Sequence, residues 1–213
     1  MPSLKDLRNR IDSVKSTRKI TSAMKMVAAS KLRRAQDQAE AGKPYAERMG
    51  GILSSLAGRV TFENGAPKLL AGTGKEDTYL IVAITADRGL CGGFNGSITR
   101  QTRNEVARLH GEGKTVKLLM VGRKSADALR RELGDAYIES LEGIQGTSVA
   151  FGDAASIGDT VRTGFEAGEF DVCTVIFNKF KSAISQEVTL KKLIPAEVDE
   201  TAAADDSGVS YEY

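Results

Sequence analysis

The amino-terminal stretch of this sequence, residues 3–40, contains neither glycine nor proline and favours one long α-helix. Ser3 and Asp6 are three residues apart, the spacing of a capping box that starts a helix. Apolar residues then recur at spacings of three and four, the pattern of a coiled-coil seam, at Leu4, Leu7, Ile11 and Val14. Such a helix would reach roughly 50 Å, which is longer than a domain behind it needs.

The composition of this helix is more unusual than its length. From Ser13 to Gln36 it contains seven Lys and Arg residues and no Asp or Glu, and it is rich in Ala, Ser and Thr. The apolar seam continues on a displaced stripe at Ile20, Met24 and Val27, and then at Ala28, Leu32 and Ala35. Because isolated helices are marginally stable in water, this narrow seam must pack against a second helix or be enclosed by another protein.

The segment that follows contains helix breakers. "GKP" at 42–44 predicts an interruption, after which residues 45–57 form a second, short helix weakened by Gly50 and Gly51. Residues 58–77 contain Gly, Asn, Pro and Thr and are predicted to form a linker loop.

From residue 78 onward, apolar runs alternate with helical patterns. "TYLIVAIT" at 78–85 is typical of a strand buried inside a parallel sheet. Further strands are predicted at 115–122, 136–141, 171–180 and 187–195, and helices at 96–110, 124–133 and 148–168. This order predicts a mainly parallel, Rossmann-like α/β domain over residues 78–195.

The end of the sequence is acidic. Residues 196–213 contain six Asp and Glu, no Lys or Arg, and no sustained apolar periodicity, which is typical of an extended tail. The predicted organisation is therefore a helical shaft with a short second helix (1–57), a linker (58–77), an α/β domain (78–195) and an acidic tail (196–213).

Composition excludes several classes of function. The two cysteines, Cys91 and Cys173, form no CxxC pair, and the single histidine, His110, excludes a multi-histidine metal site within one chain. No Ser-His-Asp or Cys-His arrangement is predicted around His110, and no G-x-S-x-G motif occurs. We expect His110 at the surface and Cys91 as a small buried residue. The first residues carry charges from Lys5 onward, so no secretory signal is predicted, and no apolar run is long enough for a transmembrane helix.

Two segments partly resemble a phosphate-binding loop of the form G-x-x-x-x-G-K-[ST]. "GEGKT" at 111–115 has Arg108 where the first glycine is required, and it follows a helix instead of opening one. "GTGKED" at 72–77 has Leu69 at that position and Glu76 after the lysine. Both are predicted to be ordinary loops.

"TADRGLCGGFN" at 85–95 has the right context, because it lies between a strand and a helix. Its glycines do not match G-x-G-x-x-G, and no lysine is placed to reach a phosphate. The prediction is a tight turn, with an anion site at the helix start as the alternative. A turn alone does not require Asp87, Arg88 and Asn95.

Three segments together resemble the gamma subunit of F-type ATP synthase. These are "SLKDLRNRIDSVKST" at 3–17, "KITSAMKMVAASKLRRAQ" at 19–36 and "TADRGLCGGFN". The resemblance implies a central rotor shaft inside a ring of three alpha and three beta subunits. It implies an α/β domain below the ring, beside epsilon and on the c-ring, and proton-driven rotation that changes the beta catalytic sites.

The resemblance also implies site residues and a location. Residues inside the ring would be Lys19, Met24, Lys25, Met26, Lys31, Arg33 and Arg34, and residues at its lower rim would be Arg88, Cys91 and Asn95. No catalytic residue, cofactor or metal is implied. The subunit would be peripheral on the cytoplasmic face of a bacterial inner membrane, or on the matrix side of an organelle, and would reach the membrane only through its complex.

One departure from the family concerns the end of the sequence. Family members carry a long helix rich in Ala and Met after the α/β domain, whereas this sequence stops at Tyr213. We therefore expect the natural chain to continue beyond this residue.

Two alternatives stay open at this point. The acid-free basic helix could belong to a nucleic-acid-binding module, although it has no interleaved aromatic residues. The α/β domain could be a nucleotide- or phosphate-binding enzyme, although its loops lack the required spacing.

Overall fold

The computed structural model describes residues 3–57, 67–144, 149–182 and 184–196. The chain divides into two compact units, Met1–Arg48 and Met49–Tyr213. Part of the predicted linker (58–66) and almost all of the predicted acidic tail (197–213) lie outside the described residues.

The first element is the helix α1, Leu4–Ala57, which at 1.5 Å per residue is about 80 Å long. Its start is a reciprocal capping box. The Ser3 N–H and hydroxyl donate to Asp6 Oδ2 at 3.0 and 2.8 Å, and the Asp6 N–H donates to Ser3 Oγ at 3.2 Å. The predicted start of the helix is therefore confirmed.

The predicted interruption at 42–44 is wrong, because α1 continues through Gly42 and Pro44 to Ala57 as a single helix. A proline inside a helix removes one backbone donor and costs about 3 kcal/mol, but the turns on either side can continue. The predicted short second helix is therefore the last part of α1.

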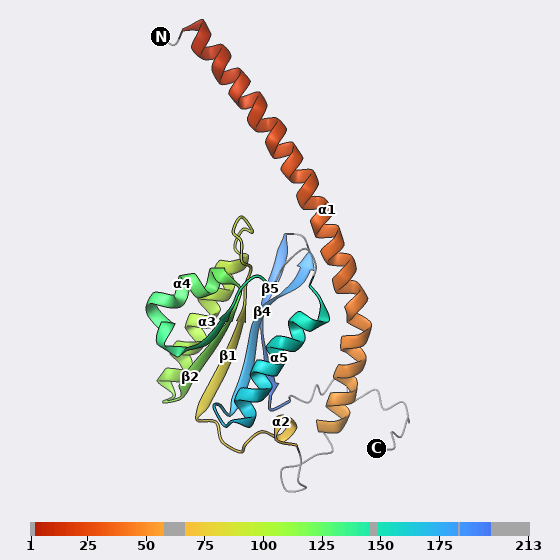
Figure 1. Ribbon diagram of the computed structural model, residues 1–213, viewed down its shortest axis with the longest axis vertical. Helices are drawn as coiled ribbons and strands as arrows, with labels where there is room; N and C mark the ends of the chain where they lie inside the picture. Colours follow the sequence, from red (N-terminus) through yellow and green to blue (C-terminus); the bar gives the residue numbers. More distant parts are fainter. Residues whose placement is uncertain (1–2, 58–66, 145–148, 183, 197–213) are drawn as a thin grey trace. The chain divides into compact units, whose positions relative to one another are not determined.

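The α/β domain is built on a five-stranded sheet in the order β3-β2-β1-β4-β5 (Figure 1). The strands are β1 (Thr78–Ile84), β2 (Thr115–Val121), β3 (Tyr137–Leu141), β4 (Val172–Ser182) and β5 (Ser185–Ile194). The first four are parallel, and β5 pairs with β4 in the antiparallel sense. The mainly parallel prediction is confirmed.

Helices cover both faces of this sheet. The helices α3 (Phe94–Gly111) and α4 (Arg123–Leu133) bury Ile98, Leu109 and Leu129 against one face. On the other face, α5 (Phe151–Glu166) buries Val161 and Phe165, and the short α2 (Lys68–Ala71) adds Leu69. A 3-10 turn, η2 (Gly134–Ala136), leads from α4 into β3.

Because β1, β2, β3 and β4 are parallel, their carboxyl ends lie together. We call the described connections at this end the carboxyl edge: residues 85–93, residue 122, residues 142–144 and 149–150, and Ile184 between β4 and β5. The 85–95 turn lies on this edge, as its sequence context predicts. None of the described helices has the length and apolar character of a membrane span.

Candidate partner-binding surfaces

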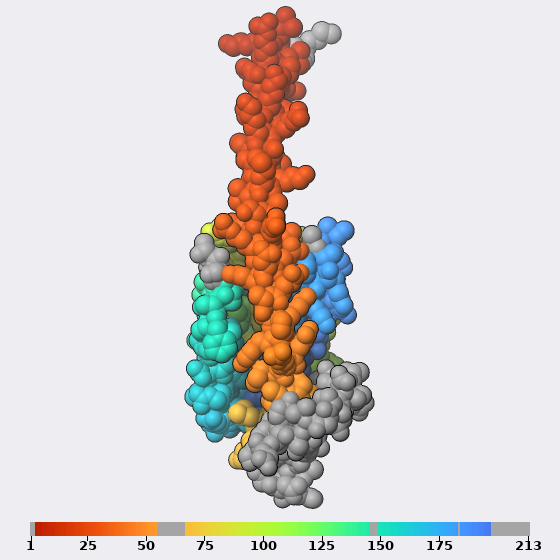
Figure 2. Space-filling view, turned by 90° about the vertical axis from the view of Figure 1, so that its right-hand side faces the viewer, coloured from red at the N-terminus to blue at the C-terminus, as the bar shows by residue number. Residues whose placement is uncertain are grey.

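The first candidate surface is α1 itself. From Ser3 to Gly50, every residue except the half-buried Gln36 is exposed. The apolar stripe is included, since Leu4 is 77% exposed and Ile20 61%. Figure 2 shows the amino-terminal part of α1, in red, as a single column of projecting side chains. A stripe of this kind is normally buried against another element, whereas here the apolar face of the helix has no partner among the described residues.

The residues that the resemblance assigns to the ring interior all lie on this exposed helix. Met24 and Met26 are 57% and 66% exposed. Within the described part of the chain no ion pair involves the five cations of the set, Lys19, Lys25, Lys31, Arg33 and Arg34. Their charges are therefore available to an external partner.

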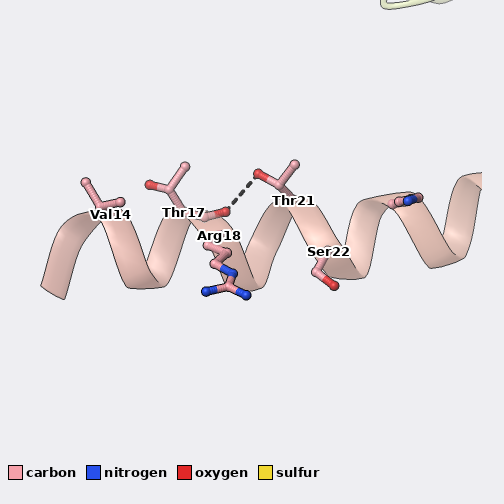
Figure 3. Close-up of a pocket in the computed structure, with 6 residues that line it drawn as sticks. Val14, Thr17, Arg18, Thr21 and Ser22 are labelled. Atoms are coloured by element: carbon pink, nitrogen blue, oxygen red, sulfur yellow. Dashed lines mark hydrogen bonds between the residues drawn. The ribbon is translucent and has the colours of Figure 1, made fainter. Parts of the chain in front are cut away.

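A shallow groove runs along α1 beside Val14 (Figure 3). Two threonines in it direct their hydroxyls back onto the helix, because Thr17 donates to Ser13 O at 3.0 Å and Thr21 donates to Thr17 O at 2.8 Å. This back-bonding satisfies the hydroxyls and leaves the threonine methyl groups for a neighbour. The groove can therefore accept an apolar side chain from another chain.

The second candidate surface is the 85–95 turn, and its carboxylate has a structural role. Asp87 Oδ1 accepts the Arg123 N–H, the first of α4, at 3.0 Å, and Asp87 Oδ2 accepts the Gly143 N–H at 3.0 Å. One carboxylate thus joins the connections that follow β1, β2 and β3, and it lies at the positive end of the α4 dipole. The sequence did not reveal this role, because both partners are more than 30 residues away.

Asn95 closes the same turn from inside. Its Oδ1 accepts the Ala86 N–H at 2.9 Å, and its Nδ2 donates to Arg88 O at 3.2 Å and to Cys91 Sγ at 3.1 Å. Asn95 is half-buried in the first turn of α3, and its amide holds the shape of the 85–95 turn.

The outer side of the turn is formed by Arg88, Leu90 and Cys91, which are all exposed. The expectation that Cys91 is buried is wrong: the turn directs residues 88–93 away from the domain, and only Cys173 of the two cysteines is buried. Within the described residues, the Arg88 guanidinium has no hydrogen bond or ion pair. Sequence reasoning also missed Leu90, which is 100% exposed with φ +63°.

The two segments that resemble phosphate-binding loops, 72–77 and 111–115, lie at the opposite edge of the sheet. "GEGKT" runs from the end of α3 into β2, and "GTGKED" leads into β1, so neither opens a helix. The predicted context of "GEGKT", after a helix and before a strand, is confirmed. His110 is exposed as expected, and no group of three or more potential metal ligands occurs among the described residues.

Comparison with known proteins supports the resemblance. A family model described as ATP synthase matches residues 3–213. The ATP synthase gamma chain of Paramagnetospirillum magneticum is 54% identical over 208 residues, which cover 98% of this chain and 71% of that protein. The ATP synthase gamma chain of Rhodospirillum rubrum is 55% identical over 204 residues, which cover 96% and 68%.

Solved structures agree with these relatives. A chain in the central stalk and c-ring of Tetrahymena thermophila mitochondrial ATP synthase superposes with a TM-score of 0.63 at 31% identity, over 87% of this chain and 84% of that one. A chain of Euglena gracilis mitochondrial ATP synthase shares the fold, with a TM-score of 0.52 at 19% identity, over 88% of this chain and 55% of that one. The chain belongs to the ATP synthase gamma-chain family.

Proposed function

We propose that this chain is the rotor subunit of the central stalk of an F-type ATP synthase and has no catalytic site of its own. Proton-driven rotation of the stalk would be coupled through α1 to conformational changes at the beta catalytic sites. The observation that carries the proposal is the exposure of α1, whose apolar stripe and cations have no partner within the described residues. The named relatives and the central-stalk structure support it.

The contacts of the shaft must be weak if it is to turn. In this proposal Lys19, Met24, Lys25, Met26, Lys31, Arg33 and Arg34 face the inside of a ring of three alpha and three beta subunits. Exposed ion pairs contribute only about 0–1 kcal/mol each. Such pairs can therefore break and re-form at each step of rotation.

The 85–95 turn would contact the lower rim of the ring. Arg88 would pair with a carboxylate of the ring, and Cys91 would lie within the contact. Asn95 would keep the turn that carries both residues in shape and would itself lie at the border of the interface. The α/β domain would lie beside epsilon and on the c-ring. The protein would thus be peripheral on the cytoplasmic face of a bacterial inner membrane, attached only through its complex.

Reconstitution tests the assembly. Co-expression of the full-length protein with alpha and beta subunits should give a complex with one copy of this chain for three of each partner, measured by native mass spectrometry. Failure of the full-length protein to co-purify with the ring would contradict the proposal.

Calorimetry tests the absence of a catalytic or nucleotide site. Titration of the isolated chain with ATP, ADP or phosphate should give no binding at micromolar concentrations, because neither of the loops 72–77 and 111–115 leads into the start of a helix. Micromolar binding would favour the alternative of a nucleotide-binding α/β enzyme.

A further inference from the structure

The antiparallel strands β4 and β5 extend beyond the rest of the sheet. The last residue of β4 that pairs with β1 is Ile176, opposite Ala83. Among the described strands, residues 177–182 of β4 pair only with residues 185–189 of β5, and we call these two segments the ribbon. Figure 1 shows the ribbon, in blue, at the same end of the sheet as the connection from β1 to α3. A two-stranded ribbon alone is marginally stable in water, so its position depends on what holds its base.

Asn178 holds the base of the ribbon against the first turn of α3. Its Nδ2 donates to Phe94 O at 3.0 Å, and its Oδ1 lies 3.4 Å from Ser97 Oγ. The Ser97 hydroxyl donates to the same Phe94 carbonyl at 2.9 Å. All three residues are half-buried, and water competes less for a hydrogen bond in such a place than at the open surface.

The same turn of α3 contains Asn95, on which the 85–95 turn depends. Asn95 Oδ1 accepts the Ala86 N–H at 2.9 Å, and Asn95 Nδ2 donates to Arg88 O at 3.2 Å. Phe94, whose carbonyl accepts the bond from Asn178, directly precedes Asn95. One turn of helix is therefore bonded to the 85–95 turn through Asn95 and to the ribbon through Asn178.

The start of α3 has little other support. Its N-cap residue is Gly93, and no side chain caps the helix among the described residues. The start of α4 differs, because Asp87 accepts the Arg123 N–H there. Without a cap, the first N–H groups of a helix lack side-chain acceptors and the first turn opens more easily. The side-chain bonds of Asn95 and Asn178 are therefore important for holding this turn closed.

We propose that the ribbon and the 85–95 turn form one coupled unit, and that Asn178 is the positioning residue that links them. Loss of the bond from Asn178 to Phe94 O lets the first turn of α3 open, and this opening releases the bonds of Asn95. The ribbon is therefore an input through which a bound protein or a mechanical load alters the 85–95 turn without touching it. This coupling is a property of the α/β domain and does not depend on the proposed function.

Coupling between two sites is reciprocal, so a change at either site must be detectable at the other. Proximity in space does not by itself demonstrate coupling. The test therefore perturbs the ribbon and the 85–95 turn in separate experiments, and each time it measures the segment that was not perturbed. Amide exchange is the measurement, because it reports the local opening of a backbone segment.

The first experiment measures amide exchange in the isolated full-length protein by mass spectrometry. Asn178→Ala should speed exchange in residues 85–95 about fivefold, the effect of losing about one hydrogen bond from a local opening equilibrium. Asn178→Asp should have a similar effect, because a carboxylate fills the same space but cannot donate to Phe94 O. Lys179→Ala is the matched control: Lys179 is the next residue of the ribbon and is exposed, so its loss should leave exchange in residues 85–95 unchanged.

The second experiment perturbs the turn in the unchanged sequence, so it stays available if the Asn178 variants do not fold. Cys91 is exposed, whereas Cys173 is buried, and Cys91 Sγ accepts a bond from Asn95 Nδ2 at 3.1 Å. Alkylation of Cys91 with N-ethylmaleimide, confirmed by peptide mass, should therefore speed exchange in residues 177–182. In Asn178→Ala, where the link is already broken, the same alkylation should have no further effect on these residues.

The outcomes distinguish coupling from a purely local role. Faster exchange in residues 85–95 for both Asn178 variants, but not for Lys179→Ala, supports the coupling. Faster exchange in the ribbon alone would mean that Asn178 only anchors the ribbon, and the coupling would be wrong. An equal increase in β2 would indicate a general loss of stability and would also overturn it, as would unchanged exchange in residues 177–182 after alkylation. None of these measurements needs alpha or beta subunits, so failure of the coupling is distinguishable from failure of the proposed function.

Discussion

Among the described glycines, Gly122, between β2 and α4, is the one where an added methyl group should lower the free energy of unfolding most. Its φ is +97°, and an added Cβ would lie 2.1 Å from Thr85 O. Gly122→Ala should lower the free energy of unfolding by about 2–4 kcal/mol, measured by urea unfolding. Gly113→Ala is the control, because Gly113 has φ +74° but no heavy atom within 4 Å of an added Cβ; it should lose about 1 kcal/mol. Equal losses would show that the contact with Thr85 is not the cause.

Asp171 ties the segment before β1 to the start of β4. Its carboxylate accepts the Thr73 hydroxyl at 2.8 Å and the Asp77 and Thr78 N–H groups at 3.1 Å. Burial alone would raise the pKa of Asp171, but these hydrogen bonds and the charge of Lys75 hold the pKa below its ordinary 3.8. Since the folded pKa is the lower one, the stabilisation is complete above about pH 5 and is lost as the pH falls below 3.8.

Asp171→Asn should therefore lower the free energy of unfolding at pH 7 by about 1–2 kcal/mol and flatten its decrease between pH 5 and pH 3. The measurement is urea unfolding at a series of pH values. Asp77→Asn should change neither quantity, because the Asp77 carboxylate has no partner within the described residues. An unchanged pH profile in Asp171→Asn would contradict the assignment.

Arg88 and Asp87 are adjacent but should respond differently to substitution. Arg88→Ala removes a guanidinium without a partner among the described residues, so it should weaken coupling or assembly and leave thermal unfolding nearly unchanged. Asp87→Ala removes the acceptor of the Arg123 and Gly143 N–H groups and should cost about 1–3 kcal/mol of stability. If Arg88→Ala unfolds the domain, the turn is purely structural and its assignment as a contact is wrong.

Sequence reasoning at this scale succeeded where the partners are local. The spacing of Ser3 and Asp6 predicted the helix start, because a capping box lies within one turn. It failed for Asp87, whose partners are brought close only by the parallel sheet. It also failed for Cys91, because burial depends on the direction in which a turn projects, and no local pattern specifies that direction.

At the scale of elements, α1 shows that local propensity is a weak guide inside a long helix. Gly42 and Pro44 do not end the helix, and an added Cβ at Gly42 would meet no heavy atom within 4 Å. Gly42→Ala together with Pro44→Ala should stabilise this segment by about 3–4 kcal/mol and slow amide exchange over residues 40–48.

Hydrogen exchange followed by mass spectrometry measures this effect in the full-length protein. Ala28→Gly, at another exposed position of α1, should speed exchange in its own turn and leave residues 40–48 unchanged. If the Gly42 and Pro44 substitutions do not slow exchange, these residues do not limit the local stability of the helix.

At the scale of the whole molecule, the sequence predicted five strands in a mainly parallel sheet but not their order. The β1 sequence "TYLIVAI" is apolar on both faces of the strand, because a strand inside a parallel sheet is covered by helices on both sides. Periodicity therefore could not show on which side of β1 the strand β4 lies. That choice depends on how α3, α4 and α5 divide between the two faces, which is decided by packing between distant residues.

The division of charge along the chain leads to the last prediction. Residues 1–48 contain twelve Lys and Arg but five Asp and Glu, whereas the whole chain has a net charge of only +2. All eight ion pairs found among the described residues involve positions from Glu76 onward, so the cations of residues 1–48 are unpaired there. In the proposed function, attraction between these cations and carboxylates of the ring should speed assembly.

Assembly of the full-length protein with alpha and beta subunits should slow by at least about tenfold between 0.1 and 1 M NaCl, because the screening length falls from about 10 to about 3 Å. The rate can be followed by fluorescence of a labelled chain. The triple substitution Lys25→Gln, Arg33→Gln and Arg34→Gln should reduce this salt dependence, whereas Lys114→Gln in the α/β domain should not. A rate independent of salt would mean that the apolar stripe of α1 alone guides the shaft into the ring.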